Sequence, residues 1–404
     1  MSTNLLKVKD NWEFMSSYPE FRNMVSTIEA EQLVFTHDDD LLQAMGSNAF
    51  DPLQKNLRVV GLDDAPLLIP QIAQQTGREE LSIEDTMTLN GGTGLMLQMG
   101  NQVFPIGQSA LSGLADRAGL THDGLNRHYP EGASAVADVL NRQFMQGKSG
   151  ACIIVNCDKV RAVNGPSYAV GQLSDILDMY EVFVAQFPQA ETKRCFISHD
   201  FIKWEVDLSA HADTLLANTA LSKNGFVPAL RFITSNTGKA AFQAIPMLKR
   251  ANSNVFIPLC MPNGVLRVRH MAKGNYTERT NALMNKILQA FECVIAALDN
   301  RSRDFEKLKT INVDNAYNAV LRVMAEVGIP KKQGMEAAKA FQGMYPAPDA
   351  ATAYDCMLAI INAYAFYVRD NAQNERGQMN VSFAVGAAMG ISWPEYSIPG
   401  EFSW

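Results

Sequence analysis

Residues 223–286 read KNGFVPALRFITSNTGKAAFQAIPMLKRANSNVFIPLCMPNGVLRVRHMAKGNYTERTNALMNK. Five lysines and five arginines stand here against a single acidic residue, Glu278, although the whole chain of 404 residues has a formal net charge of −7. We call residues 223–286 the basic segment. Because a local field of one sign selects partners of the opposite sign, the basic segment indicates a surface for a polyanion.

The basic segment also predicts the central part of the fold. Short strands are expected at 229–233 and 241–245, joined by the turn residues 236–239. Two further strands are expected at 255–259 and 265–270, on either side of a second turn at 261–264, where Pro-Asn-Gly is a turn signature. We therefore expect two consecutive hairpins or a small antiparallel meander, with arginine and lysine on its open face.

The last of these strands alternates apolar and basic residues. In an extended chain Val265, Arg267 and Arg269 share one face. Leu266, Val268 and His270 share the other. The two arginines are therefore expected to point outward together, about 7 Å apart by the rise of an extended chain.

Candidate nucleic-acid-binding residues follow from this pattern. Exposed cations would contact phosphates, and aromatic rings, with Phe242 as a further one, would offer bases a stacking face. The candidates are Lys239, Lys249, Arg250, Arg267, Arg269, Lys273, Phe232 and Tyr276. The alternative is a solvated sheet face whose charges share a sign without binding a ligand. The sequence leaves both interpretations open.

The composition is that of an ordinary globular protein, with 47% hydrophobic and 19% charged residues. There is no run of 18 apolar residues to predict a membrane span, and the first residues lack the pattern of a secretory leader. The six cysteines form no CxxC pair, which favours free thiols in a reducing cytoplasm. The six histidines are also scattered, so we expect no metal and no cofactor.

The chain divides into three predicted regions. Residues 1–94 form an acidic N-terminal region, with 15 acidic against 6 basic residues through residue 100. Residues 95–300 form an α+β core that contains the basic segment. Residues 301–404 form a helical region that ends in an apolar, aromatic tail. We expect an α+β fold of antiparallel hairpins packed against helices. We also expect a homo-oligomer, because such a tail must dock on this subunit or on a neighbour.

Two local motifs invite a metal-binding or catalytic interpretation. The run from His37 to Asp40 could ligate a metal, but the stronger interpretation is that Thr36 or Asp38 caps a helix beginning near Leu41, with acids at its positive end. Ser198, His199 and Asp200 are adjacent in sequence. Neighbours on a strand point to opposite faces, so these three cannot form a triad among themselves. The basic segment holds one acid, which argues against a metal-dependent nuclease centred there. We therefore expect no catalytic residues.

A series of segments resembles a family of phage- and plasmid-encoded proteins, domain of unknown function 932, over about residues 95–390. The segments, in order, are Ala110–Leu120, Val160–Val163 with Tyr168, Phe232–Gly238, Arg250 with Cys260 and Asn263–Gly264, Arg267–His270, and Thr352–Asp355 with Ala359. This chain departs from the family pattern at Met261–Pro262. The resemblance implies a mobile element, a phage, with genes of DNA metabolism nearby, and it brings no settled activity.

Together these observations predict a phage-encoded nucleic-acid-binding protein in the host cell cytoplasm. Single-stranded DNA is the favoured ligand, with annealing in phage recombination as the expected role, because a basic groove tracks phosphates without reading bases. The alternative is a virion-associated or oligomeric assembly protein. In that case the arginines would pair with the acidic N-terminal region of the same or a neighbouring subunit.

Overall fold

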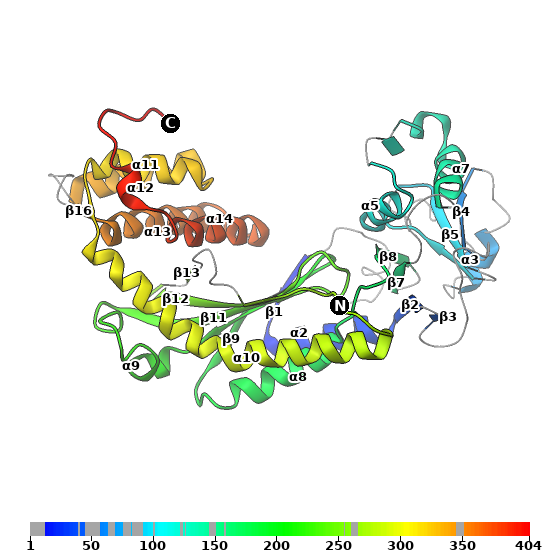
Figure 1. The fold of residues 1–404 in the computed structure, drawn as a ribbon, viewed down its shortest axis with the longest axis horizontal. Coiled ribbons are helices and arrows are strands. Elements are labelled where there is room, and N and C mark those ends of the chain that lie inside the picture. Colours follow the sequence, from blue (N-terminus) through cyan, green and yellow to red (C-terminus); the bar gives the residue numbers. More distant parts are fainter. Residues whose placement is uncertain are drawn as a thin grey trace.

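A computed structural model describes residues 13–38, 41–44, 57–63, 69–75, 82, 92–99, 102–121, 124–125, 127–144, 151–156, 159–253, 255–259, 266–344 and 351–404. The protein has an α+β fold, built from antiparallel sheets and packed helices. Figure 1 shows the largest sheet between two groups of helices, with a second group of strands and helices beside it.

The largest sheet has the order β1-β9-β10-β11-β12-β13, and β14 also pairs with β12. All of these pairs are antiparallel. Its strands are β1 (Glu13–Ser16), β9 (Glu191–Ser198), β10 (Ile202–Asp207), β11 (Phe226–Thr234), β12 (Phe242–Arg250), β13 (Phe256–Pro258) and β14 (Leu266–Val268).

Three helices cover one face of this sheet. They are α2 (Tyr18–Ala30), α8 (Leu173–Val184) and α10 (Tyr276–Lys307). Alternate residues of β10 and β11, such as Trp204 and Phe232, point into their shared core, while the residues between them face the other way. The helix α10 begins at a capping box. The side chain of Asn275 accepts a hydrogen bond from the backbone N–H of Glu278, and the side chain of Glu278 accepts one from the backbone N–H of Asn275.

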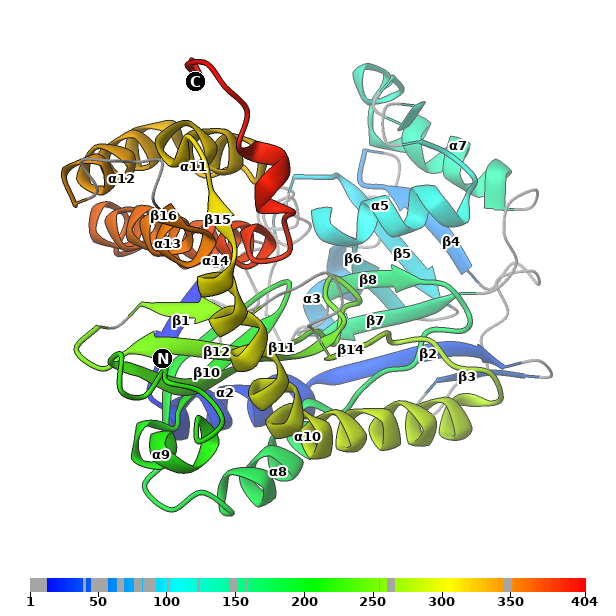
Figure 2. The ribbon, with the colours of Figure 1, turned by 60° about the vertical axis from the view of Figure 1, so that its left-hand side comes forward.

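The C-terminal helices lie over the opposite face of the sheet (Figures 1 and 2). They are α11 (Ala316–Glu326), α12 (Lys331–Met344), α13 (Ala353–Asp370) and α14 (Glu375–Ala388). A small sheet pairs β15 (Asn312–Val313) with β16 (Ala351–Thr352) at the start of α13. The short helix α9 (Ala212–Leu215) follows β10 and packs near β11.

Two smaller sheets form the remaining part. One has the order β3-β2-β7-β8, from β2 (Gln32–Asp38), β3 (Leu41–Ala44), β7 (Cys152–Asn156) and β8 (Lys159–Asn164). The other has the order β4-β5-β6, from β4 (Leu57–Gly61), β5 (Leu95–Met99) and β6 (Gln102–Pro105). The helices of this part of the molecule are α3 (Ile69–Gln75), α5 (Gln108–Arg117) and α7 (Ala133–Phe144). A parallel bridge between Ile106 and Val160 joins the two sheets.

The predicted strands of the basic segment are present. The hairpin of β11 and β12 turns at Gly238, whose φ of 83° suits glycine. The second hairpin differs from the prediction, because β13 and β14 both pair with β12, one after the other along it. The predicted turn at 261–264 lies outside the described residues.

One expectation for the N-terminal region is corrected. The residues from Leu41 form strand β3 and no helix, and the side chains of residues 36–40 lie outside the described set. The predicted division at residue 94 stays a prediction. Strands β1, β2 and β4 pair with β9, β7 and β5, so this region contributes to three different sheets.

The C-terminal tail docks on its own chain. Trp393, in the short 3-10 helix Trp393–Tyr396, is fully buried. Arg322 of α11 donates to the Ile398 carbonyl at 2.7 Å, and the ring of Trp404 lies against Gly334 of α12. The tail therefore gives no support to the predicted homo-oligomer, which stays a prediction.

Candidate functional site

A groove lies between β14 and the exposed side of α10. Its volume is about 610 Å³, within the range of ligand-binding clefts. We call it the β14–α10 groove. It is lined by Leu266, Arg267, Val268, Arg269, Met271, Lys286, Gln289, Ala290 and Cys293. Of the residues predicted to bind nucleic acid, Arg267 and Arg269 line this groove. Lys286 was counted in the basic segment but was not chosen as a candidate.

The alternation predicted for this strand is confirmed. Arg267 and Arg269 are exposed and His270 is buried. The His270 ring stacks on Tyr168, and its Nδ1 lies 3.2 Å from the Ala169 carbonyl oxygen. Burial lowers the pKa of His270 to about 4, so the ring is neutral at physiological pH. This anchor holds the segment that carries the two arginines against the loop before α8.

The opposite wall of the groove is one face of α10. Lys286, Gln289 and Cys293 stand three and four residues apart, which places them on the same side of a helix. Met271 closes one end of the groove and is 58% exposed. The groove therefore combines cationic groups with an amide and a few apolar contacts.

The cations of the groove have no acidic partner within the described part of the chain. Arg267, Arg269 and Lys286 take part in no ion pair there, and no acidic side chain lines the groove. Other exposed cations of the same helix are paired, such as Lys307 with Asp304. The β14–α10 groove is therefore a place where positive charge remains available to a ligand.

The other predicted cations lie elsewhere. Lys249 is buried and forms an ion pair with Asp207, so it is not available to a phosphate. Arg250 is exposed and lies over the Phe226 ring, at the far end of β12 from β14. Lys239 is exposed at the β11–β12 turn and donates to the Ser109 carbonyl at 3.1 Å. Lys273 is exposed in the loop before α10.

The predicted stacking rings are not at the surface. Phe232 and Phe242 are fully buried, and both pack against Phe291 of α10. Tyr276 is half-buried and packs against a small core that contains Tyr168. Within the part of the chain that the structure describes, no aromatic residue lines the groove. Apolar contact there comes from aliphatic and sulfur-containing side chains instead.

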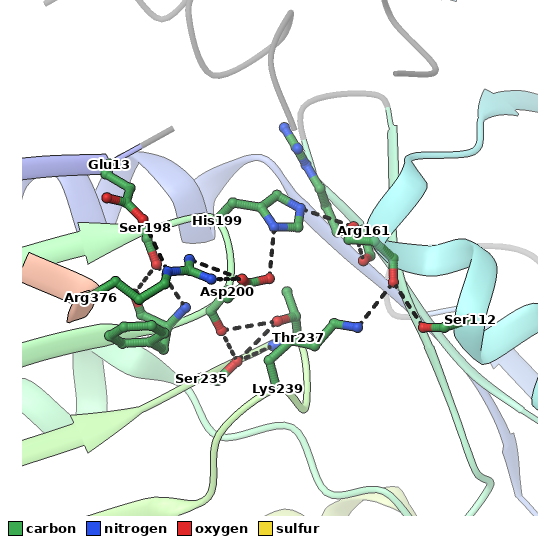
Figure 3. Close-up of polar contacts among 12 residues, drawn as sticks. Glu13, Ser112, Arg161, Ser198, His199, Asp200, Ser235, Thr237, Lys239 and Arg376 are labelled. Carbon is green, nitrogen blue, oxygen red and sulfur yellow. Dashed lines mark hydrogen bonds and ion pairs between the residues drawn. The ribbon is translucent and has the colours of Figure 1, made fainter. Parts of the chain in front are cut away.

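A second polar cluster, formed by Ser109, His199 and Asp200, lies where the start of α5 meets the turn between β9 and β10 (Figure 3). Ser198 donates its hydroxyl to the Phe201 carbonyl at 2.9 Å, which agrees with the prediction that it forms no local triad. His199 instead reaches Ser109, 90 residues earlier in the chain. The distance from His199 Nε2 to Ser109 Oγ is 3.0 Å, and Nδ1 lies 3.1 Å from Asp200 Oδ1.

Neighbouring residues keep the Asp200 carboxylate of this cluster ionised. The hydrogen bond with His199, and then the ion pair with Arg376 of α14, lower the pKa of Asp200 to about 2. The carboxylate is therefore ionised throughout the physiological range. The Ser109 hydroxyl also donates a hydrogen bond of 2.9 Å to the Arg161 carbonyl oxygen. Figure 3 shows Lys239 reaching the same first turn of α5 from the β11–β12 turn.

Sequence reasoning missed Ser109 because the three groups come from two distant segments. One local signal was available. A strand, Gly107-Gln108-Ser109 and then a helix follow one another in sequence, and this order places a serine in the first turn of the helix. Nothing in the sequence told which histidine would lie beside it.

No family model, no curated protein and no solved structure matches this chain. Within the described residues no group of three or more His, Cys, Asp or Glu side chains is placed to hold a metal ion. The helices of the described part include none that is long and apolar enough to cross a bilayer.

Proposed function

We propose that this protein binds single-stranded nucleic acid, with the phosphate backbone lying in the β14–α10 groove. The observation that carries the proposal is the set of three cations, Arg267, Arg269 and Lys286, that line one groove without an acidic partner among the described residues. Unpaired cations gathered along a groove attract a phosphate chain and release its counterions.

The geometry favours a single strand over a duplex. Arg267 and Arg269 are two residues apart in an extended segment, so their backbone positions are roughly 7 Å apart, close to the phosphate spacing of an extended strand. Lys286 faces them from α10. The three cations therefore suit one phosphate chain lying along the groove.

The lining also supports binding without sequence preference. Specific readout of bases relies on directed side-chain pairs, and strong stacking relies on aromatic rings. Among the described residues, the groove offers one amide, Gln289, and no aromatic ring. We therefore propose a binding energy dominated by phosphate contacts and weakened steeply by salt.

The biological setting is part of the same proposal. The segments that resemble domain of unknown function 932 support an origin in a phage, within the host cell cytoplasm. The annealing role in recombination is proposed from the groove and does not come from the resemblance. Assembly into a virion or scaffold was the alternative. It is compatible with the mixed α+β content, the acidic N-terminal region and the apolar tail, but that tail is docked on its own chain.

Fluorescence anisotropy with labelled 40-mer oligonucleotides tests the proposal. At low salt the protein is expected to bind the single strand, whatever its sequence, more tightly than the matching duplex. Lys286→Ala should weaken this binding several-fold. Lys307→Ala is the matched control, because it removes an exposed lysine from the same helix roughly 30 Å further along, at 1.5 Å per residue. A parent protein that ignores both oligonucleotides at low salt would refute the function.

A further inference from the structure

The cluster of Ser109, His199 and Asp200 is independent of the groove and has the arrangement of an activated nucleophile. We propose that Ser109 is a nucleophile that attacks small carboxylic esters, with His199 as its general base. The two distances, 3.0 Å from Ser109 Oγ to His199 Nε2 and 3.1 Å from Nδ1 to Asp200 Oδ1, suit this relation.

The tautomer of His199 follows from its partners. Asp200 is an ionised carboxylate that accepts a hydrogen bond from Nδ1–H, so the lone pair of Nε2 faces Ser109 Oγ. The Ser109 hydroxyl proton therefore has two acceptors within reach, Nε2 at 3.0 Å and the Arg161 carbonyl oxygen at 2.9 Å, and the reaction uses the first. Arg376 donates two hydrogen bonds, each of 3.1 Å, to the other oxygen of Asp200 and fixes the orientation of the carboxylate. His199 itself is 7% exposed, so its ring is held by packing as well.

The position of Ser109 helps to stabilise the negative charge that develops during acyl transfer. It lies in the first turn of α5, where none of the described side chains caps the helix and none of the residues is acidic. The positive end of the helix can therefore stabilise the negative charge that develops on the carbonyl oxygen of an ester attacked by Ser109 Oγ. Lys239 donates to the Ser109 carbonyl and adds a positive charge at the same place. Ser109 is half-buried, which suits a small acyl group.

A place for the hydrolytic water lies beside the histidine. His199 lines a cavity of about 30 Å³ together with Ser198, Asn236 and Thr237. This volume holds one or two water molecules, and the polar groups in its partly apolar lining can hydrogen-bond them. The cavity is therefore a source of water next to the general base.

The reaction balances without a further reactant. The Ser109 hydroxyl proton moves to His199 Nε2 while Oγ forms a bond to the ester carbonyl carbon. The bond from that carbon to the alcohol oxygen breaks, and the alcohol leaves with the proton from His199. A water molecule then gives its proton to His199, attacks the acyl carbon and releases the acid. Ser109 recovers the proton.

A fluorophosphonate probe tests the proposal on the intact protein. Attack by Ser109 Oγ would form an oxygen–phosphorus bond and expel fluoride together with the hydroxyl proton. We expect one covalent adduct per chain, which peptide mass spectrometry locates at Ser109. Hydrolysis of p-nitrophenyl acetate should accompany it. Ser109→Ala should abolish both signals, and His199→Ala should slow labelling roughly 100-fold or more, the usual worth of a general base.

The controls separate catalysis from a structural role. Ser112→Ala, on the same helix one turn later, should leave labelling unchanged. Thermal melting of each variant shows whether it is folded. If the folded parent takes no probe at Ser109, the cluster is a structural contact between α5 and the β9–β10 turn, and the proposal is wrong. Oligonucleotide binding by Ser109→Ala should equal that of the parent, so the two proposals fail independently.

Discussion

Single charged residues join the large sheet to α14. Lys203, Glu205 and Arg231 project from β10 and β11 toward this helix, and all three are almost fully buried. Glu375 of α14 accepts a hydrogen bond from Lys203 at 2.7 Å and pairs with Arg194. Burial alone would raise the pKa of the Glu375 carboxyl, but Lys203 and Arg194 outweigh it and hold the pKa at about 2.

The low pKa of Glu375 predicts a pH dependence of stability. The group titrates near 4.5 when unfolded and near 2 when folded, so its contribution is complete above about pH 4.5 and is lost as the pH falls toward 2. Its size is on the order of 3 kcal/mol, at about 1.4 kcal/mol per pKa unit. Denaturant unfolding of Glu375→Gln should show a lower free energy of unfolding at pH 7.

The same experiment at acidic pH provides the check. As the pH falls from 4.5 to 2, the difference in the free energy of unfolding between the parent protein and Glu375→Gln should shrink. A difference that stays constant over that range would show that the ion pairs do not set the stability of this contact.

For single residues, the sequence was enough to predict which side chains of β14 face outward, but it was not enough to predict which buried charges pair. Alternation was enough to place Arg267 and Arg269 outside and His270 inside, because a strand has a period of two. It was not enough for Arg231, since its partner Glu205 stands on another strand. The pairing of β10 with β11 brings these two residues opposite each other, and no local pattern contains that register.

At the scale of elements, the contact between α5 and β8 depends on a glycine. A Cβ added at Gly113 would lie 2.1 Å from the Val163 carbonyl oxygen, a backbone atom that cannot easily move. The close approach of α5 to β8 sets the position of the first turn of α5, which carries Ser109. The helix itself was predictable from its apolar spacing, and this approach was not, because it depends on a partner strand about fifty residues later.

The glycine predicts a reversal of normal helix propensity. Alanine usually stabilises a helix by up to about 1 kcal/mol relative to glycine. Gly113→Ala is instead expected to destabilise the protein by roughly 1–3 kcal/mol, through overpacking against β8. Gly343→Ala, in α12, meets no atom within 4 Å and is the matched control that should be neutral or stabilising. Equal melting temperatures for the two variants would contradict this view of the contact.

The C-terminal tail predicts the effect of a deletion. Removal of residues 393–404 takes away the buried Trp393 and uncovers the apolar surface of α11 and α12. Loss of a buried tryptophan costs roughly 3–5 kcal/mol, so the melting temperature should fall or the protein should aggregate. Light scattering alongside the melt gives the mass. A smaller mass with no loss of stability would show that the tail docks on a neighbouring subunit.

At the scale of the whole molecule, the positive charge of the basic segment is divided. One part is neutralised inside the sheet, as with Lys249 and Asp207, and another part faces solvent in the β14–α10 groove. The α+β class and the hairpin of β11 and β12 were predictable from local patterns. The pairing of β14 with β12 and the approach of α10 were not, and together they form the groove.

The salt dependence of single-strand binding tests the central claim most directly. Each neutralised phosphate contributes roughly −0.7 to the slope of log affinity against log salt. The account predicts that Arg267→Ala with Arg269→Ala makes the slope shallower by about one to two units at an unchanged melting temperature. The control pair Arg303→Ala with Lys307→Ala, at the other end of α10, should keep the slope of the parent. A groove variant that also keeps that slope would contradict the account.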